Sequence, residues 1–269
     1  YLQMGLHKMS DQLSVPDHIT QEGQTYKDSF DHGTERWTLA GILQNSSNVG
    51  MIMAGENYPD EQRYEYLTKF GIGQPTGLNL PGESSGLLTN PSAWDLRTRN
   101  TILFGQGYTV NALQLNNVVA TIANKGVKQQ QSIIKSTTDA NGKTTESKKG
   151  EATRVVDEKV ASDMMNAMES VAEGYNKFVK VDGYRMAAKS GTAEVQGSDG
   201  TLSSIISDYS VVIPADNPRY AVTVVMKDPN GVFGGLTAGP VSAQICEFLM
   251  QKYEVPVSGP RKNAIPVTW

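Results

Sequence analysis

Three strand-like runs near the C-terminus constrain the fold more than any other feature of this sequence. The runs span 184–195, 205–213 and 220–226, and turn-forming residues separate them at 197–200 and 214–218. Connections this short predict an antiparallel meander. The last run is apolar on both of its faces, so both sides of the sheet need cover. We therefore predict an antiparallel sheet with helices on both faces.

Helical periodicity elsewhere in the sequence predicts the helices that cover this sheet, and it predicts a further helical subdomain. Apolar residues recur at helical spacing in several segments, most of which have a capping residue at the start or a glycine at the end. The predicted helices span 39–45, 49–54, 61–70, 111–124, 157–174 and 239–253. The fold class predicted from these elements is a mixed α/β domain.

The remaining segments read as turns, loops and a tail. The pair Asn141-Gly142 predicts a hairpin between flanking strands. Residues 15–33 are polar and rich in turn formers, and residues 72–99 lack periodicity and are predicted as a long ordered loop. We place the domain at residues 1–253, without its N-terminal part, and a C-terminal tail at 254–269.

Composition and charge exclude several classes of function. The chain has 24 Lys and Arg against 28 Asp and Glu, and it has no basic run. These features argue against nucleic acid or an anionic membrane surface as its partner. No apolar stretch approaches the roughly 18 residues that cross a bilayer, so we expect any membrane anchor outside this chain. The lone Cys246 lies in an apolar run and is predicted to be buried and inert.

Histidines are too few to predict a metal site. His7, His18 and His32 all lie near the N-terminus. We therefore expect no metal and no cofactor. A Ser-His-Asp triad is possible only if one of these three is its base.

Two short motifs carry hydroxyl, amide and ammonium groups. Ser46-Ser47-Asn48 joins two predicted helices, where such residues also serve simply as helix caps. Lys189-Ser190-Gly191-Thr192 lies in a predicted strand, where Lys189 and Gly191 share a face. A glycine in mid-strand marks a bulge or the close approach of a ligand or of another backbone, and an edge strand can also pair with an extended peptide. Each motif alone is explained as well by structure as by function.

Together the two motifs resemble the S-x-N and K-S/T-G-T elements of penicillin-binding proteins and β-lactamases, which carry out serine acyl transfer. Further segments resemble class B penicillin-binding proteins of the cell-division type, in that family's order: 70–77, 104–107, 111–115 and 234–240. The resemblance implies a β-lactamase/transpeptidase-like fold. It also implies a peptidoglycan D,D-transpeptidase that cross-links peptides through a serine acyl-enzyme and is a target of β-lactams.

Roles for individual residues follow from the same resemblance. It implies that Ser46 relays a proton, that Asn48 holds a substrate amide, and that Lys189 orients the Ser46 hydroxyl and makes the site electropositive. The terminal carboxylate of the substrate is assigned to Ser190, Gly191 and Thr192, and the Thr192 backbone N–H to the oxyanion hole. The implied partners are peptidoglycan stem peptides, β-lactam antibiotics and membrane proteins of cell-wall synthesis and division. The implied location is the outer face of the bacterial cytoplasmic membrane.

The serine nucleophile of this family lies on an S-x-x-K motif in a helix, where Ser and Lys share a face. The one match here, Ser132-Ile133-Ile134-Lys135, begins a predicted hairpin strand and follows the S-x-N motif instead of preceding it. We reject this match. Residues 1–5 are typical of the end of a helix with a glycine stop. We therefore expect the S-x-x-K motif just before Tyr1, and this chain alone to be inactive.

Two alternatives stay open. A D,D-carboxypeptidase or β-lactamase-like hydrolase uses water in place of the acceptor amine. A non-enzymatic sensor domain binds β-lactams without turnover. The sequence lacks the deacylating Glu motif of class A β-lactamases, and comparison of products is needed to separate the three functions.

Overall fold

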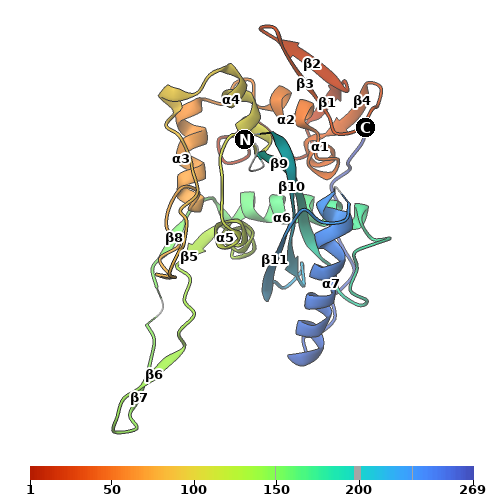
Figure 1. The fold of residues 1–269 in the computed structure, drawn as a ribbon. Coiled ribbons are helices and arrows are strands. Elements are labelled where there is room, and N and C mark those ends of the chain that lie inside the picture. The colour runs from red at the N-terminus through yellow and green to blue at the C-terminus, as the bar shows by residue number, and fades with distance from the viewer. Residues whose placement is uncertain (149, 197–200, 232) are drawn as a thin grey trace.

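A three-stranded antiparallel sheet forms the centre of the computed structural model (Figure 1), which describes residues 1–148, 150–196, 201–231 and 233–269. Its strands are β9 (Ala187–Gln196), β10 (Leu202–Ile213) and β11 (Tyr220–Lys227), in the order β11-β10-β9. The predicted meander is confirmed. The turn predicted at 197–200 lies outside the described residues. Strand β9 is therefore an edge of this sheet.

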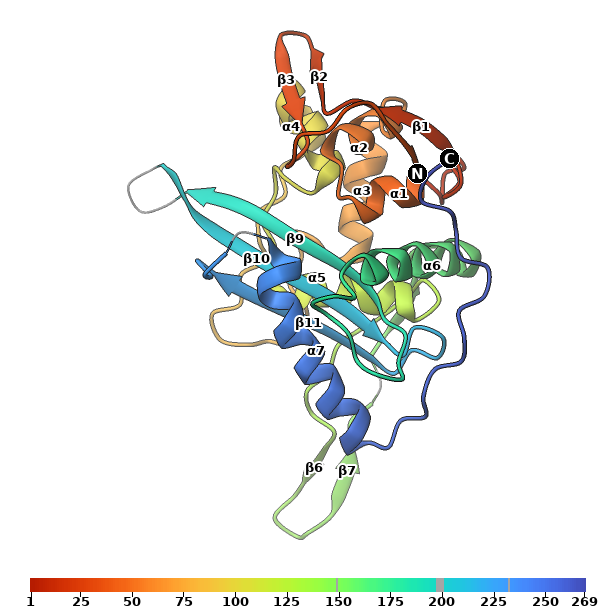
Figure 2. The same cartoon turned by 90° about the vertical axis from the view of Figure 1, so that its right-hand side faces the viewer.

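Helices cover both faces of the sheet, as predicted (Figure 2). On one face, Tyr209, Val211 and Ile213 of β10 pack in a core with residues of α7 (Gly234–Lys252). On the other face, Val212 packs against residues of α5 (Ala112–Ala123) and α6 (Glu158–Gly174). This alternation follows from the two-residue period of a strand.

Helix α7 begins at Gly234, five residues before the predicted start at Gly239. The reason is the close approach of the helix to the sheet. A Cβ atom at Gly234 would lie 2.2 Å from the backbone oxygen of Asp208 and 2.4 Å from that of Gly191. Only glycine fits there, so Gly234 allows the first turn of the helix to lie against the sheet.

The helical subdomain lies beside the sheet and contains α1 (Leu39–Gln44), α2 (Asn48–Ala54), α3 (Asp60–Phe70) and α4 (Leu96–Thr101) (Figure 1). The predictions for the first three helices and for α5 and α6 are confirmed. The loop prediction for 72–99 is wrong at its end. Two 3-10 turns, η1 (Pro91–Ala93) and η2 (Ile102–Phe104), flank α4, and the Asp95 side chain caps it. Helix α4 has no apolar periodicity from which it could be predicted.

Short two-stranded sheets complete the fold. The polar segment 15–33 was predicted only as turns, but it contains β2 (His18–Gln21) and β3 (Gln24–Lys27). The other pairs are β1 (Gln12–Val15) with β4 (Glu35–Thr38), β5 (Val127–Gln129) with β8 (Ala152–Arg154), and β6 (Ser136–Thr138) with β7 (Thr144–Glu146).

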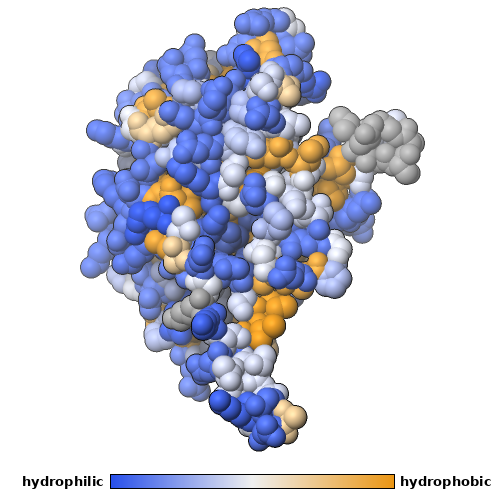
Figure 3. Space-filling model, turned by 90° about the vertical axis from the view of Figure 1, so that its left-hand side faces the viewer, coloured by the Kyte–Doolittle hydropathy of each residue, from blue (hydrophilic) through white to orange (hydrophobic). Residues whose placement is uncertain are grey.

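The β6–β7 hairpin confirms the prediction made from Asn141-Gly142, and Gly142 has the expected positive φ of 82°. Both of its strands are exposed. The hairpin projects from the body at the bottom of Figure 3, where its surface is hydrophilic for most of its length. The predicted strand from Ser132 begins only at Ser136.

The segment 254–269 runs back along α6 toward the N-terminal part of the chain (Figure 2). Thr38 N–H donates to the Val267 carbonyl at 3.1 Å, and Thr268 forms an isolated bridge with Trp37. At the other end, the first residues form a hydrogen-bonded turn, in which Leu6 N–H donates to Tyr1 O and Gly5 has a φ of 69°. No helix among the described residues is long and apolar enough to span a membrane.

Candidate active site

Ser46 and Lys189 meet although they lie 143 residues apart in the chain. Helix α1 ends at Gln44 with Asn45 as its C-cap, Ser46 adopts a left-handed φ of 51°, and Ser47 caps α2 by accepting from Gly50 N–H at 2.8 Å. This tight turn between two helices leaves the Ser46 side chain exposed. The Lys189 ammonium on the edge strand donates to the Ser46 hydroxyl and, at 2.7 Å, to the Ser190 carbonyl.

Asn48, the third residue of the S-x-N motif, is the first residue of α2 and is half-buried. Its side-chain nitrogen donates to the Lys27 carbonyl at the end of β3, at 3.1 Å. The strand pair β2–β3, which sequence reasoning missed, therefore helps to fix this motif.

The second motif alternates between the two faces of β9. Lys189 points toward Ser46, on the face that Gly191 shares, whereas Ser190 and Thr192 point to the opposite face, toward Tyr175 and the start of α7. The Ser190 hydroxyl lies 3.2 Å from the Tyr175 hydroxyl, and the Thr192 hydroxyl accepts from Gly234 N–H at 3.1 Å. A ligand that touches both sets of side chains must therefore lie along the free edge of the strand.

Asp208 is a neighbour of this site that sequence reasoning missed. It pairs with Gly191 across the two strands, and a Cβ atom at Gly191 would lie 2.0 Å from its carboxylate oxygen. Gly191 is therefore a place of close approach, because the Asp208 carboxylate lies against it and the backbone of Gly234 lies against its carbonyl oxygen. The approach of a ligand to Gly191 stays a prediction. An acidic residue in the middle of the apolar run 205–213 was the available signal.

Burial and mutual charge shift the pKa values of this pair. Burial lowers the pKa of Lys189 to about 8, and the Asp208 charge acts against that shift. Burial raises the pKa of Asp208 to about 6, and Lys189 acts against that shift. The Lys189 ammonium can therefore release a proton near neutral pH, as groups that transfer protons in catalysis commonly do.

The S-x-x-K match at Ser132–Lys135 lies outside helices and strands and is exposed. The Ser132 hydroxyl instead donates to the Ile134 carbonyl at 3.1 Å. The rejection of this match as a catalytic pair is therefore supported by the structure.

Among the residues that the structure describes, the histidines do not form a Ser-His-Asp triad. His7 and His18 contact Asp11 and Asp17, respectively. His32 contacts Asp28, but the neighbouring Ser47 hydroxyl also donates to that carboxylate and not to the imidazole. Cys246 is buried, as predicted, and burial raises its thiol pKa to about 12.

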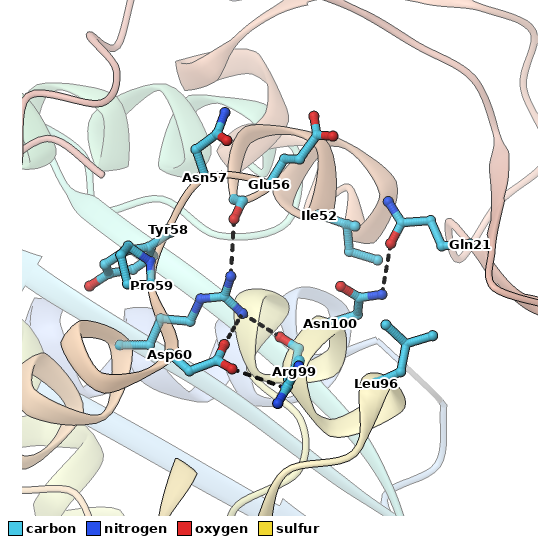
Figure 4. Close-up of a pocket in the computed structure, with 12 residues that line it drawn as sticks. Gln21, Ile52, Glu56, Asn57, Tyr58, Pro59, Asp60, Leu96, Arg99 and Asn100 are labelled. Atoms are coloured by element: carbon cyan, nitrogen blue, oxygen red, sulfur yellow. Dashed lines mark hydrogen bonds and ion pairs between the residues drawn. The ribbon is translucent and has the colours of Figure 1, made fainter. Parts of the chain in front are cut away.

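A cavity of about 430 Å³ lies at the far end of α2, and none of the predicted site residues lines it. Asp60 and Arg99 face each other there and form an ion pair at 3.0 Å (Figure 4). Arg63 also pairs with Asp60 and donates to the carbonyls of Gly55 and Arg99. Asp60, Arg63 and Arg99 thus pair with one another, and we assign this cavity a structural role only.

Comparison with known proteins identifies the family that this chain resembles. Residues 2–247 match the family described as penicillin binding protein transpeptidase domain. The chain is 33% identical over 271 residues to penicillin-binding protein PbpB of Mycolicibacterium smegmatis, covering 96% of the chain and 42% of that protein. It is 37% identical over 213 residues to peptidoglycan D,D-transpeptidase FtsI of Escherichia coli K12, covering 77% of the chain and 34% of that protein. The chain thus spans about two fifths or less of these relatives' length.

Solved structures show the same likeness. A peptidoglycan synthetase from Bifidobacterium adolescentis is 68% identical, with a TM-score of 0.95, over 100% of this chain and 49% of that one. Penicillin binding protein 3 from Mycobacterium tuberculosis, complexed with ampicillin, is 31% identical, with a TM-score of 0.91, over 100% of this chain and 62% of that one. The observed fold is therefore that of penicillin-binding-protein transpeptidase domains, as the sequence predicted.

Proposed function

We propose a function on the premise that this chain belongs to the family of penicillin-binding protein transpeptidase domains. The whole protein is a peptidoglycan D,D-transpeptidase that forms peptide cross-links through a serine acyl-enzyme. The observation that carries this proposal is the contact between Ser46 and Lys189. It joins two distant motifs into one arrangement suited to move a proton.

The reaction divides into acylation and transfer. A serine hydroxyl attacks the carbonyl carbon between two D-alanines of a stem peptide, loses its proton, and forms an ester as the peptide bond breaks. The departing D-alanine nitrogen takes up a proton. In the second step, the amine of a neighbouring stem peptide attacks the ester, loses a proton, and restores the serine hydroxyl.

Ser46 and Lys189 serve these proton movements. The Ser46 hydroxyl both donates and accepts, so it can pass a proton to the departing nitrogen and take one from the attacking amine. Lys189 orients that hydroxyl. With a pKa of about 8, its ammonium can also return a proton to Ser46 near neutral pH. Asn48 holds a substrate amide through its side-chain oxygen, because its nitrogen already donates to Lys27.

The free edge of β9 receives the substrate. Ser190, Gly191 and Thr192 bind the terminal carboxylate, and the Thr192 backbone N–H contributes to the oxyanion hole together with the serine's own N–H. An extended stem peptide lying along this edge can reach the Lys189 face and the Ser190 face at once. β-Lactams imitate the donor peptide and acylate the same serine.

The acylating serine comes from a part of the whole protein outside this chain. The only S-x-x-K match within the chain is off any helix and exposed. The chain alone is therefore not acylated and is inactive, since losing such a serine costs roughly 10⁶-fold in comparable enzymes. The whole protein works on the outer face of the bacterial cytoplasmic membrane, with membrane proteins of cell-wall synthesis and division as partners.

Product analysis on the whole protein tests the proposal. The enzyme is incubated with a donor stem peptide ending in two D-alanines and an acceptor peptide with a free side-chain amine, and the products are separated by mass spectrometry. A cross-linked peptide supports transpeptidation. Release of D-alanine without cross-linking indicates the hydrolase, and acylation by penicillin without turnover of peptides indicates the sensor domain.

A further inference from the structure

A buried carboxylate lies directly beneath the S-x-N turn. Asp28 follows β3, and its side chain is fully buried. One carboxylate oxygen accepts from the Ser47 hydroxyl at 2.6 Å, and the other accepts from Val49 N–H at 3.0 Å. Together with the bond from Asn48 to the adjacent Lys27 carbonyl, these contacts tie the front of α2 to the end of β3.

His32 completes the set of donors around this carboxylate. Its Nε2 lies 3.0 Å from the same Asp28 oxygen that binds Ser47, and its Nδ1 lies 2.7 Å from the Gly33 carbonyl. Both partners accept hydrogen bonds, and the imidazolium form of His32 can donate to both at once. Burial opposes that charge, but the bonds to Asp28 and Gly33 leave the pKa of His32 raised. The buried Asp28 is thus paired, as a buried charge must be.

Ser46 depends on these contacts because its backbone is strained. A serine with a φ of 51° lies in a region that costs a side-chain-bearing residue energy and persists only where the surroundings enforce it. On one side, the turn is held to α1 by bonds from Ser46 N–H and Ser47 N–H to the carbonyls of Leu43 and Ile42. On the other side, the Asp28 carboxylate holds the turn by accepting from the Ser47 hydroxyl and from Val49 N–H.

We infer that Asp28, which contacts His32, is a positioning residue for the proposed acyl-transfer reaction. It holds Ser47 and Val49 in place as a clamp, and so sets where the Ser46 hydroxyl and the Asn48 amide lie. This inference rests on the proposed function for its catalytic consequence. The clamp itself is a property of the described residues and can be tested without any substrate.

Asp28→Asn and Ser47→Ala each remove one side of the clamp, and neither residue belongs to the proposed catalytic set. Asp95→Asn is the matched control, since Asp95 also caps a helix, α4, by accepting from Thr98 N–H at 2.7 Å. Helix α4 carries no predicted site residue.

Hydrogen exchange on the chain tests the clamp. We expect the amide protons of Val49 and Gly50 to exchange at least about 10-fold faster in Asp28→Asn than in the wild type, and to be unchanged in Asp95→Asn. Unchanged exchange at these two amides in Asp28→Asn overturns the inference.

Acylation of the whole protein by a labelled penicillin tests the catalytic consequence. The first-order acylation constant should fall by up to about 100-fold in Asp28→Asn and Ser47→Ala, the loss expected when a reacting group moves by about 1 Å. The dissociation constant of the initial complex should change by less than the acylation constant does, and the double variant should be no slower than the worse single variant. Wild-type acylation constants in both variants overturn the positioning role. Failure of the wild type itself to be acylated refutes the proposed function, and the exchange result then decides the clamp alone.

Discussion

The substitution Gly191→Ala tests the close packing of Asp208 against the edge strand. The new Cβ atom would lie 2.0 Å from one carboxylate oxygen of Asp208 and 2.8 Å from its Cγ, whereas ordinary contact begins near 3.4 Å. The carboxylate must therefore turn away by more than 1 Å. Overpacking of this kind costs about 1–3 kcal/mol, and replacing a strand glycine by alanine returns about 0.5–1 kcal/mol. The net loss of stability should be up to about 2.5 kcal/mol, which lowers Tm by up to roughly 10 °C in a domain of this size.

Thermal unfolding of the chain measures this loss. In an Asp208→Ala background the obstruction is absent, so Gly191→Ala should cost nothing or stabilise slightly. The two substitutions should then show an interaction free energy of about 1–3 kcal/mol. Gly33→Ala serves as the control, because a Cβ atom at Gly33 meets nothing within 4 Å. If Gly191→Ala costs the same in both backgrounds, Asp208 does not fill this space and the account of the edge strand is wrong.

Two further substitutions test charges in and near the site. Asp208→Asn removes the negative charge that raises the pKa of Lys189 against the effect of burial. The Lys189 titration midpoint, followed by NMR of lysine labelled at ¹³Cε, should therefore move below about 8. An unchanged or higher midpoint contradicts the proposed coupling. Arg185→Ala leaves the Glu169 carboxylate, which is 9% exposed, without the bonds at 2.7 and 2.8 Å that pair it with Arg185. Because Arg261 Nε remains 3.7 Å from that carboxylate, unfolding in urea at pH 7 should show a loss of about 1.5–3 kcal/mol. A loss below about 1 kcal/mol refutes the pairing as a stabilising contact.

Local chemistry in the sequence was sufficient to predict the main elements. The cap at Thr38 and the glycine stop at Gly71 each mark a helix boundary that the structure contains. The three apolar runs near the C-terminus predicted the meander and its cover on both faces. The convergence of Ser46 with Lys189 was predicted only because two motifs were combined with a family resemblance, since neither motif alone distinguishes a site from a helix cap or a bulge.

Elements held by tertiary contacts could not be predicted in this way. Strand β4 is short and polar, and it is stabilised by Val267 and Thr268 from the opposite end of the chain. Helix α4 is held by contacts such as the bond from Asn100 to Gln21. The packing of Asp208 against Gly191 depends on the register of β9 with β10, which the sequence does not specify.

The contact between Ser46 and Lys189 is tested most directly by the rate at which a labelled penicillin acylates the whole protein. Wild type, Ser46→Ala, Lys189→Ala and the double variant are compared. Since proton transfer by a positioned group contributes about 10²–10⁴-fold, each single variant should slow acylation by that order. Because the two groups act as one unit, the double variant should be no slower than the worse single variant. Losses that multiply in the double variant, or a wild-type rate in either single variant, would contradict the central claim that these two side chains form one proton-transfer site.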